Sequence, residues 1–341
     1  MPNLQDQKQN SNAKPPSAAP PPWHSVLFIL IMISGSIWNL PSLESIDQVA
    51  TIDAFTTPVI PPFGSARSSL VTMGLVRLSF ALFIFIFLIY RIVDPQTFEF
   101  ETSPLQSSKL RKNKIQLKGF RRNATFTMWS FLFLGCSFLG SAIITLQIAF
   151  DNDDTTSSKT HISPWLLRFS LLSFEIAAPS GFLVSTVVRY ALWPNHLAQQ
   201  GSKGTIGFRS FYGLVSHNAN IFFILVESCL LGGLPVRMEH IAFAPTLGIV
   251  YIVFTWWMST RWTTANNGDG NRSPNFIYFF LDTTLGWTTS KALVVLLLVL
   301  IIFFVLLSQV NLLLEQYLGN ALLPRLIAMS GIALCVCRFQ D

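Results

Sequence analysis

The residues of this chain that could do chemistry are few, and two of them lie near the start of long apolar segments. Thr127 is three residues into an apolar segment over 125–149, and His217 is about five residues into another over 212–233. A Thr hydroxyl is a weak nucleophile until a neighbouring base removes its proton, and His is the usual base because its pKa is near neutral. Such a pair would attack an ester carbonyl. The alternative is structural, because Thr caps helices and His hydrogen-bonds neighbouring helices without any chemistry.

The order of these segments places the two side chains at one membrane face. If 125–149 and 212–233 both cross the membrane, one complete crossing separates them, so both start at the same face. At 1.5 Å per residue, their candidate side chains differ in depth by only roughly 3 Å. The loop over 261–290 returns to that face and brings Tyr278 and Asp282 with it. A hydroxyl, an imidazole and a carboxylate are therefore predicted to converge just below one interface.

Further polar residues could support this site. Asn218, Asn220 and Tyr278 are candidates for stabilising an oxyanion, and the sequence does not choose among them. Glu227 lies in the middle of the same apolar segment as His217. Without a partner its carboxyl would be protonated there, because burial disfavours the charged form.

The elements that must position these residues are membrane helices. Hydrophobic residues make up 51% of the 341 residues and charged residues only 12%, with a mean hydropathy of +0.48. An ordinary soluble domain has about 25% charged residues. This composition excludes a soluble globule and a disordered chain, and four cysteines are too few for a disulfide scaffold. No nucleotide-binding loop or metal-binding motif occurs, so the sequence predicts neither cofactor nor metal.

Six apolar segments are long enough to cross a hydrocarbon core of about 30 Å, which needs roughly 20 residues. A helix is the only open-chain structure that satisfies the backbone there. The sequence therefore predicts an all-α polytopic integral membrane helix bundle. Its six strong spans are at about 68–92, 125–149, 164–193, 212–233, 241–260 and 291–315.

The two ends of the chain are predicted to differ from this membrane domain over 67–316. Residues 1–22 are polar and Pro-rich, which is typical of a disordered tail. Residues 23–40 form a weak first span or a signal anchor, and a polar, acidic loop continues to residue 66. Within 317–341, the apolar run from Asn320 to Val336 is interrupted by Pro and Arg, which indicates an interfacial or re-entrant piece.

The net charge of +6 is unevenly distributed among the loops. Basic residues gather in the loops over 93–124, 194–211 and 261–290, whereas the alternating loops over 41–66 and 150–163 are acidic. This alternation places all the basic loops on one side, which the positive-inside rule assigns to the cytosol. The clustering indicates membrane orientation rather than nucleic-acid binding.

A charged residue at the centre of a membrane span costs at least about 2.5–3.5 kcal/mol on insertion scales, so four charged residues inside the predicted spans are informative. They are Arg77, Arg168, Glu175 and Glu227. Arg168 and Glu175 are seven residues apart and lie on nearly the same helix face, so a structural pair linking helices is one interpretation. The alternative is a transporter in which the four residues line a pathway for a small molecule.

Four short motifs occur in order along residues 70–315: Phe126-Thr127-Met128-Trp129-Ser130 followed by Gly135 to Gly140, Ala178-Pro179-Ser180-Gly181-Phe182-Leu183-Val184, His217-Asn218-Ala219-Asn220 running to Glu227, and Tyr278-Phe279-Phe280-Leu281-Asp282. In order and spacing they resemble the androgen-induced, FAR-type multi-pass membrane protein family and its rolling-stone-like relatives. Phe279 stands where the family has Pro. The Phe-Thr-x-Trp-Ser run resembles the rolling-stone-like branch most closely.

This resemblance implies a helical bundle, typically of six spans, and an activity. Some family members hydrolyse fatty acid esters of hydroxy fatty acids with a Thr nucleophile and a His near the membrane. Those roles fall on Thr127 and His217, and Thr125 stays open as the nucleophile because the motif aligns only to within one residue. The rolling-stone-like branch is instead linked to cell fusion.

The sequence as a whole predicts a membrane-embedded hydrolase of lipid esters in the endomembrane system or the plasma membrane. Its expected partners are membrane lipids and a lipid-ester substrate, with no nucleic acid. The alternatives are a non-catalytic adhesion or fusion protein and a small-molecule transporter, although no inverted repeat of the transporter kind occurs.

Overall fold

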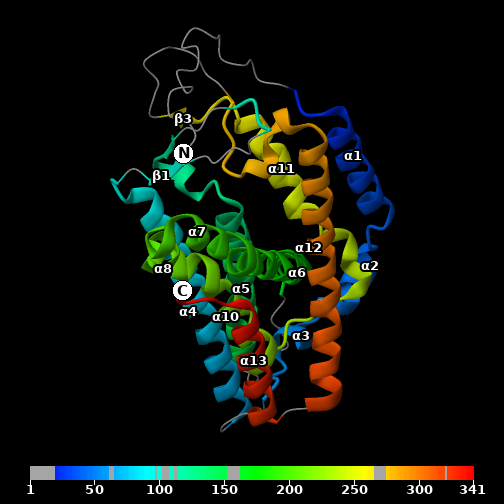
Figure 1. The fold of residues 1–341 in the computed structure, drawn as a ribbon. Coiled ribbons are helices and arrows are strands. Elements are labelled where there is room, and N and C mark those ends of the chain that lie inside the picture. Colours follow the sequence, from blue (N-terminus) through cyan, green and yellow to red (C-terminus); the bar gives the residue numbers. More distant parts are fainter. Residues whose placement is uncertain are drawn as a thin grey trace, which may run out of the picture.

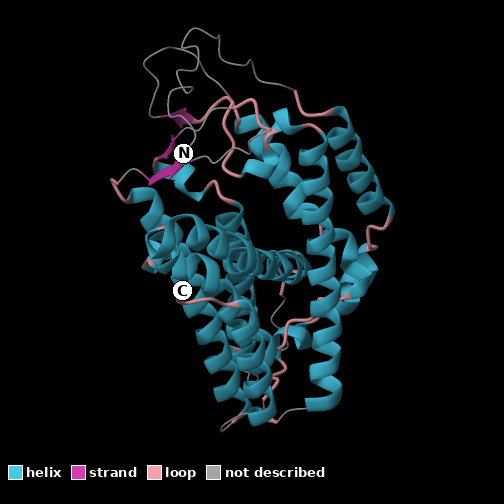
Figure 2. Ribbon diagram, in the orientation of Figure 1, coloured by secondary structure: helices cyan, strands magenta, loops and turns pink. Residues whose placement is uncertain are grey.

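The computed structural model describes residues 20–60, 65–96, 98–101, 107–110, 114–151, 162–264, 274–318 and 321–341. Most of these residues form helices (Figure 2). Most of the predicted Pro-rich tail over 1–22 lies outside the described residues. So do the centre of the acidic loop over 150–163 and parts of two basic loops.

Six helical segments of the described chain are long and apolar enough to cross a membrane. They are Ala66–Val93, Phe126–Phe150, Pro164–Ala198, Phe211–Leu230, Met238–Met258 and Trp287–Leu318. Each matches one of the six predicted spans to within a few residues. The predicted all-α polytopic bundle is therefore confirmed, and the protein is an integral multi-pass membrane protein.

Several of these segments join shorter helices end to end (Figure 1). α4 (Ala66–Val93) and α5 (Phe126–Phe150) are each a single helix. Elsewhere, π-turns and 3-10 turns connect helices within one segment. The other spanning helices are α6 (Pro164–Val187), α7 (Trp193–Gln200), α9 (Phe211–Leu214), α10 (Asn220–Leu230), α11 (Thr246–Met258) and α12 (Trp287–Leu313), with the short α8 (Ile206–Arg209) before α9.

The weak N-terminal segment forms α1 (Trp23–Trp38) and is followed by α2 (Leu43–Val49) and α3 (Ile52–Thr56). The chain bends by 73° between α1 and the pair α2–α3, so this segment is a broken span or a re-entrant loop. Ser42 and Thr51 cap α2 and α3 by accepting hydrogen bonds from backbone N–H groups three residues on. These caps explain why the chain turns twice within a short acidic loop.

The core of the bundle is the packing of α5 between α4 and α6. Small residues allow close contact, since a Cβ on Gly135 of α5 would meet Ile84 of α4 at 2.8 Å. Phe rings fill the next layer, where Phe131 and Phe223 stack with their ring centroids 6.4 Å apart. A second cluster of buried side chains joins α1, α11 and α12. In Figure 1, α12 runs along most of the length of the molecule.

A small antiparallel sheet links two loops at one end of the bundle. Its strands are β1 (Phe98–Glu101), β2 (Lys114–Leu117) and β3 (Thr263–Thr264), in the order β1-β2-β3. Ile115 of β2 pairs with Thr264 of β3. The basic loops over 93–124 and 261–290 therefore meet at the same end, as their place in the predicted topology requires.

The C-terminal apolar run forms α13 (Leu322–Val336), which is too short to count as a span on its own. Its Arg325 side chain is only 2% exposed and donates a hydrogen bond to the Leu314 carbonyl oxygen. α13 packs against α10, and the chain beyond it lies across the end of α6 and α7. The last residues thus form part of the folded bundle.

Candidate functional site

Thr127 lies in the first turn of α5 and is only 6% exposed. Thr125 is the N-cap residue of this helix, and its side chain makes no capping hydrogen bond. The Thr127 hydroxyl is a neighbour of the Tyr278 hydroxyl, which in turn neighbours Tyr251. We call Thr127, Tyr251 and Tyr278 the hydroxyl cluster. It brings together three elements that lie far apart in the sequence.

The two tyrosines of the hydroxyl cluster differ in their hydrogen bonds and in their surroundings. The Tyr251 hydroxyl of α11 donates to the Ala124 carbonyl oxygen at 3.0 Å, which ties α11 to the start of α5. Burial raises the pKa of Tyr278 to about 12, although the neighbouring Thr127 hydroxyl and Phe126 backbone partly offset this effect. Tyr278 therefore keeps its proton at neutral pH and can act as a hydrogen-bond donor.

His217 lies in the π-turn Val215–Ala219, which joins α9 to α10 and packs against both α5 and α6. Its ring contacts Phe208 with the ring centroids 5.9 Å apart, and its backbone carbonyl accepts a hydrogen bond from Ser185. The ring Nδ1 is buried and has no hydrogen-bond partner among the described residues. No hydrogen bond joins His217 to Thr127, although the structure describes both residues.

The depths of Thr127 and His217 can be compared from a contact between their helices. Phe131 of α5 stacks on Phe223 of α10. Thr127 precedes Phe131 by one turn, roughly 6 Å along the helix, and His217 precedes Phe223 by roughly 9 Å. Because both helices begin at the same end, the two residues differ in depth by only about 3 Å.

The two asparagines next to His217 have different environments. Asn218 is fully engaged, because its Nδ2 donates to the Arg338 carbonyl oxygen at 2.9 Å and its Oδ1 accepts from the Arg338 backbone N–H at 3.3 Å. Asn220 is completely buried against Gly181 of α6, and neither of its amide atoms has a partner within the described chain. Asn218 therefore holds the chain end, while Asn220 has unused hydrogen-bonding capacity.

Asp282 is buried, and its contacts are those of a local cap. Its Oδ1 accepts from the backbone N–H and the hydroxyl of Thr284, both at 2.8 Å, and its Oδ2 accepts from the Ser108 hydroxyl. The last contact ties the 3-10 turns Phe279–Leu281 and Thr283–Leu285 to the loop over 93–124. Asp282 thus positions the chain just after Tyr278.

Glu227 forms a buried ion pair with Arg77 and lies away from the hydroxyl cluster. Both side chains are 0% exposed, and the guanidinium donates to the two carboxylate oxygens at 3.0 and 2.5 Å. Arg77 Nη1 also donates to the Phe55 carbonyl oxygen and to the Thr145 hydroxyl. Glu227 lies about 15 Å along the helix from His217. Its carboxyl group therefore links α10 to α4 and does not contribute to the candidate site.

Arg168 and Glu175 both link helices, but each binds a partner outside α6. Arg168 binds Asp47 of α2 through two nitrogens at 2.6 and 2.7 Å. Glu175 binds the His240 ring at 2.7 Å and the Arg237 backbone N–H at 2.9 Å. Sequence reasoning did not predict the role of His240. Its place just before an apolar segment was the available signal, and it is shared by many capping residues.

Comparison with known proteins gives no match to a family model, to a curated protein or to a solved structure. The FAR-type resemblance stays a prediction on the motifs alone. Within the described residues, no three His, Cys, Asp or Glu side chains come together as metal ligands would. The support for a function therefore comes from the geometry of the site.

Proposed function

We propose that the protein is a membrane-embedded hydrolase of lipid esters, with Thr127 as nucleophile and His217 as base. The observation that supports this most strongly is the similar depth of the two side chains at one end of neighbouring helices. The unpartnered Nδ1 of His217 adds to it, because this nitrogen is not committed to a structural hydrogen bond.

In the proposed reaction the Thr127 hydroxyl attacks the acyl carbonyl of the ester while His217 takes its proton. The tetrahedral intermediate then collapses, the bond to the alcohol breaks, and His217 returns the proton to the leaving oxygen. Water hydrolyses the acyl-enzyme in the same way. Since no hydrogen bond joins the two residues, the substrate or a bridging water has to complete the proton path.

Tyr278 is the best candidate for stabilising the oxyanion. It neighbours the proposed nucleophile, and its high pKa keeps the phenol protonated as a donor. Asn218 is less suited, because its amide holds the backbone of Arg338. Asn220 has free donors but faces Gly181 deeper in the bundle.

The transporter alternative is weakened by the partners of the intramembrane charges. Arg77 binds Glu227, Arg168 binds Asp47 and Glu175 binds His240, so all four residues named for a pathway are held in contacts between helices. Pairing between helices gives these charges a structural role that requires no pathway. The adhesion alternative predicts no reactive hydroxyl and is tested below.

A fluorophosphonate probe tests the proposal in detergent-solubilised or membrane-bound protein. We expect the wild type to be labelled and Thr127→Ala and His217→Ala to lose labelling. Ser130→Ala is the matched control, because the Ser130 hydroxyl is also buried one turn further along α5 and donates to the Ala177 carbonyl oxygen. A folded wild type that takes no label, or labelling that persists in Thr127→Ala, would refute hydrolysis at this site.

A further inference from the structure

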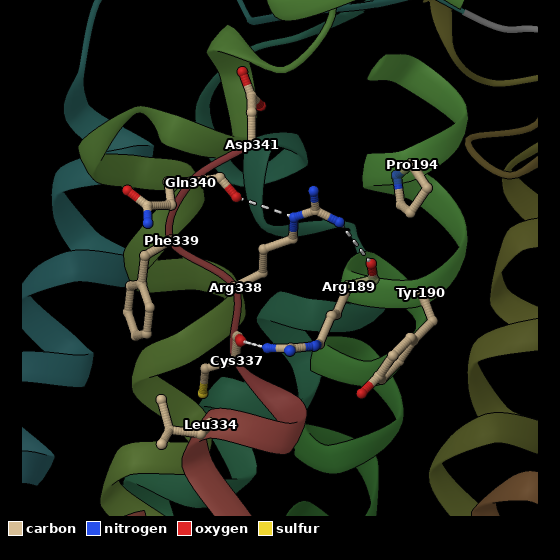
Figure 3. Close-up of a pocket in the computed structure, with 9 residues that line it drawn as sticks. All are labelled: Arg189, Tyr190, Pro194, Leu334, Cys337, Arg338, Phe339, Gln340 and Asp341. Atoms are coloured by element: carbon tan, nitrogen blue, oxygen red, sulfur yellow. Dashed lines mark hydrogen bonds between the residues drawn. The ribbon is translucent and has the colours of Figure 1, made fainter. Parts of the chain in front are cut away.

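A cavity of about 500 Å³ lies between the C-terminal residues and the end of the long α6–α7 segment (Figure 3). We call it the arginine pocket, because Arg189 and Arg338 line it from its two sides. Tyr190, Pro194, Phe339 and Asp341 also contribute to its walls. The helical wall comes from the π-turn Val188–Leu192 and α7, and the other wall is extended chain.

The extended wall over 337–341 and the last turn of α13 before it are held in place by several hydrogen bonds. Arg189 donates to the Cys337 carbonyl oxygen, and the Tyr190 hydroxyl donates to that of Cys335 at 2.6 Å. Asn218 binds both backbone groups of Arg338. The pocket is therefore built from ordered chain on both sides.

Two cationic side chains and one anionic side chain line the arginine pocket. Its carboxylate, Asp341, accepts hydrogen bonds from Trp193 Nε1 at 3.0 Å and from the Thr205 hydroxyl at 2.7 Å, and it pairs with Arg209 at 3.4 Å. These contacts lower the pKa of Asp341 and commit its oxygens. The two lining guanidinium groups have no carboxylate partner among the described residues.

Both lining guanidinium groups keep free donors. Each guanidinium has five N–H donors. Arg189 uses one nitrogen, on Cys337, and Arg338 uses two, on the carbonyl oxygens of Gln340 and Arg189. Arg338 also lies over the Trp193 ring, with its Cζ atom 5.2 Å from the ring centroid. These contacts fix the direction of both side chains and leave donors available for an anion.

The arginine pocket lies near the end of a membrane-spanning segment. Arg189 lies near the end of the 35-residue apolar segment Pro164–Ala198, in the part beyond the roughly 20 residues that a bilayer crossing needs. Tyr190 and Phe339 are about 60% exposed, as aromatic residues at a headgroup boundary commonly are. The adjoining loop over 194–211 is one of the three basic loops.

We propose that the arginine pocket binds the phosphate of an anionic lipid headgroup. Guanidinium groups match phosphate oxygens in geometry and charge, and basic pockets beside membrane helices suit such headgroups. The aromatic side chains at the rim would contact the acyl chains or the glycerol. This site is separate from the proposed hydrolase site and does not depend on it, because neither Thr127 nor His217 lines the pocket.

The test uses the full-length protein in a neutral detergent. Binding of dioleoylphosphatidylglycerol, dioleoylphosphatidylcholine and sodium phosphate is measured by native mass spectrometry and by the shift in melting temperature. We expect phosphatidylglycerol to bind more tightly than phosphatidylcholine, and Arg189→Gln and Arg338→Gln each to weaken its binding about fivefold or more. Lys291→Gln is the matched control, since this exposed lysine follows another basic loop and lies outside the pocket.

Three results would overturn the proposal: equal affinity for the two lipids, unchanged affinity in both arginine variants, or an equal loss in Lys291→Gln. Stabilisation by sodium phosphate at the same concentration as the lipid would overturn the assignment to a lipid. Arg189→Lys separates charge from folding, because it keeps the positive charge and should retain the preference for phosphatidylglycerol. Fluorophosphonate labelling of these variants reports independently on the proposed hydrolase site.

Discussion

Arg77 and Glu227 show how single residues are stabilised inside this bundle. Their side chains have no exposed surface, and Thr145 supports the pair by donating to the Ser141 carbonyl oxygen while it accepts from Arg77. A Cβ on Gly232 would lie 3.3 Å from Glu227 Oε1 and would overlap the Arg77 guanidinium, so the chain after α10 passes directly over the pair. Removing one charge would leave the other buried without compensation.

We predict that Glu227→Gln lowers the free energy of unfolding by about 3–5 kcal/mol, because it strands the buried Arg77 charge. The double variant Arg77→Met with Glu227→Leu should lose much less, since it removes both charges and the Thr145 hydroxyl can donate to the Phe55 carbonyl oxygen in place of that of Ser141. Unfolding in mixed micelles titrated with sodium dodecyl sulfate measures both. Lys291→Met, at an exposed lysine, is the control. An equal loss in the single and double variants would contradict this account.

The sequence allowed the buried charges to be predicted, but not how they pair. A charge inside an apolar run can be read directly, whereas its partner depends on which helices are neighbours. Arg168 and Glu175 share a face of α6, yet Arg168 binds Asp47 of α2 and Glu175 binds His240 of the 3-10 turn Met238–Phe243. In the same way, Tyr278 was one of three oxyanion candidates until the tertiary structure placed it beside Thr127.

Tyr278→Phe tests the proposed oxyanion donor. If the protein hydrolyses esters as proposed, we expect kcat to fall about 10²-fold with little change in KM, because the lost hydrogen bond acts only on developing charge. The pKa of about 12 also predicts that activity does not decline through ionisation of Tyr278 up to about pH 10, the ordinary pKa of Tyr. Tyr251→Phe is the control, because its hydroxyl is bound to Ala124. An equal fall in both variants would show a structural effect only.

At the scale of elements, the six spans could be predicted because hydropathy and length decide them, and their bounds agree with the structure to within a few residues. The irregular turns inside these spans could not be predicted from the sequence. The π-turns Val188–Leu192 and Val215–Ala219 insert an extra residue but contain no Gly or Pro, although Pro194 follows the first of them within two residues. They depend on tertiary contacts such as the hydrogen bond from Ser185 to the His217 carbonyl oxygen. Both π-turns lie where we propose a site.

The packing of α8 against α9 gives a prediction at this scale. A Cβ on Gly213 would overlap the Gly207 carbonyl oxygen and lie 2.6 Å from that of Phe208. Backbone atoms cannot rotate away, so we expect Gly213→Ala to destabilise the protein by about 1–3 kcal/mol and to displace the turn that carries His217. Gly207→Ala is the matched control, because nothing lies within 4 Å of its Cβ position. The melting temperatures of the two variants are compared, and equal values would contradict the packing argument.

At the scale of the whole molecule, contacts between distant segments agree with the alternation of charge along the chain. β2 and β3 join the basic loops over 93–124 and 261–290. At the other end, Asp47 of the acidic loop over 41–66 binds Arg168 near the start of α6, and Phe55 binds Thr145 near the end of α5. Loop charge could therefore predict which loops share an end. It did not predict the small sheet, because β1 and β2 alternate between apolar and polar residues over only four residues each, and β3 has only two residues.

This arrangement predicts the accessibility of single cysteines introduced at exposed positions into a background without native cysteines. In sealed vesicles of one orientation, Lys118→Cys and Lys203→Cys should react with a membrane-impermeant maleimide from the same side, because both belong to basic loops. Glu44→Cys should react only from the other side, since α2 is tied to the start of α6 through Asp47. Labelling after detergent permeabilisation is the control that all three thiols are reactive. If Glu44→Cys and Lys118→Cys were labelled from one side, α4 could not be a membrane crossing, because it is the spanning helix that separates these two positions in the described chain.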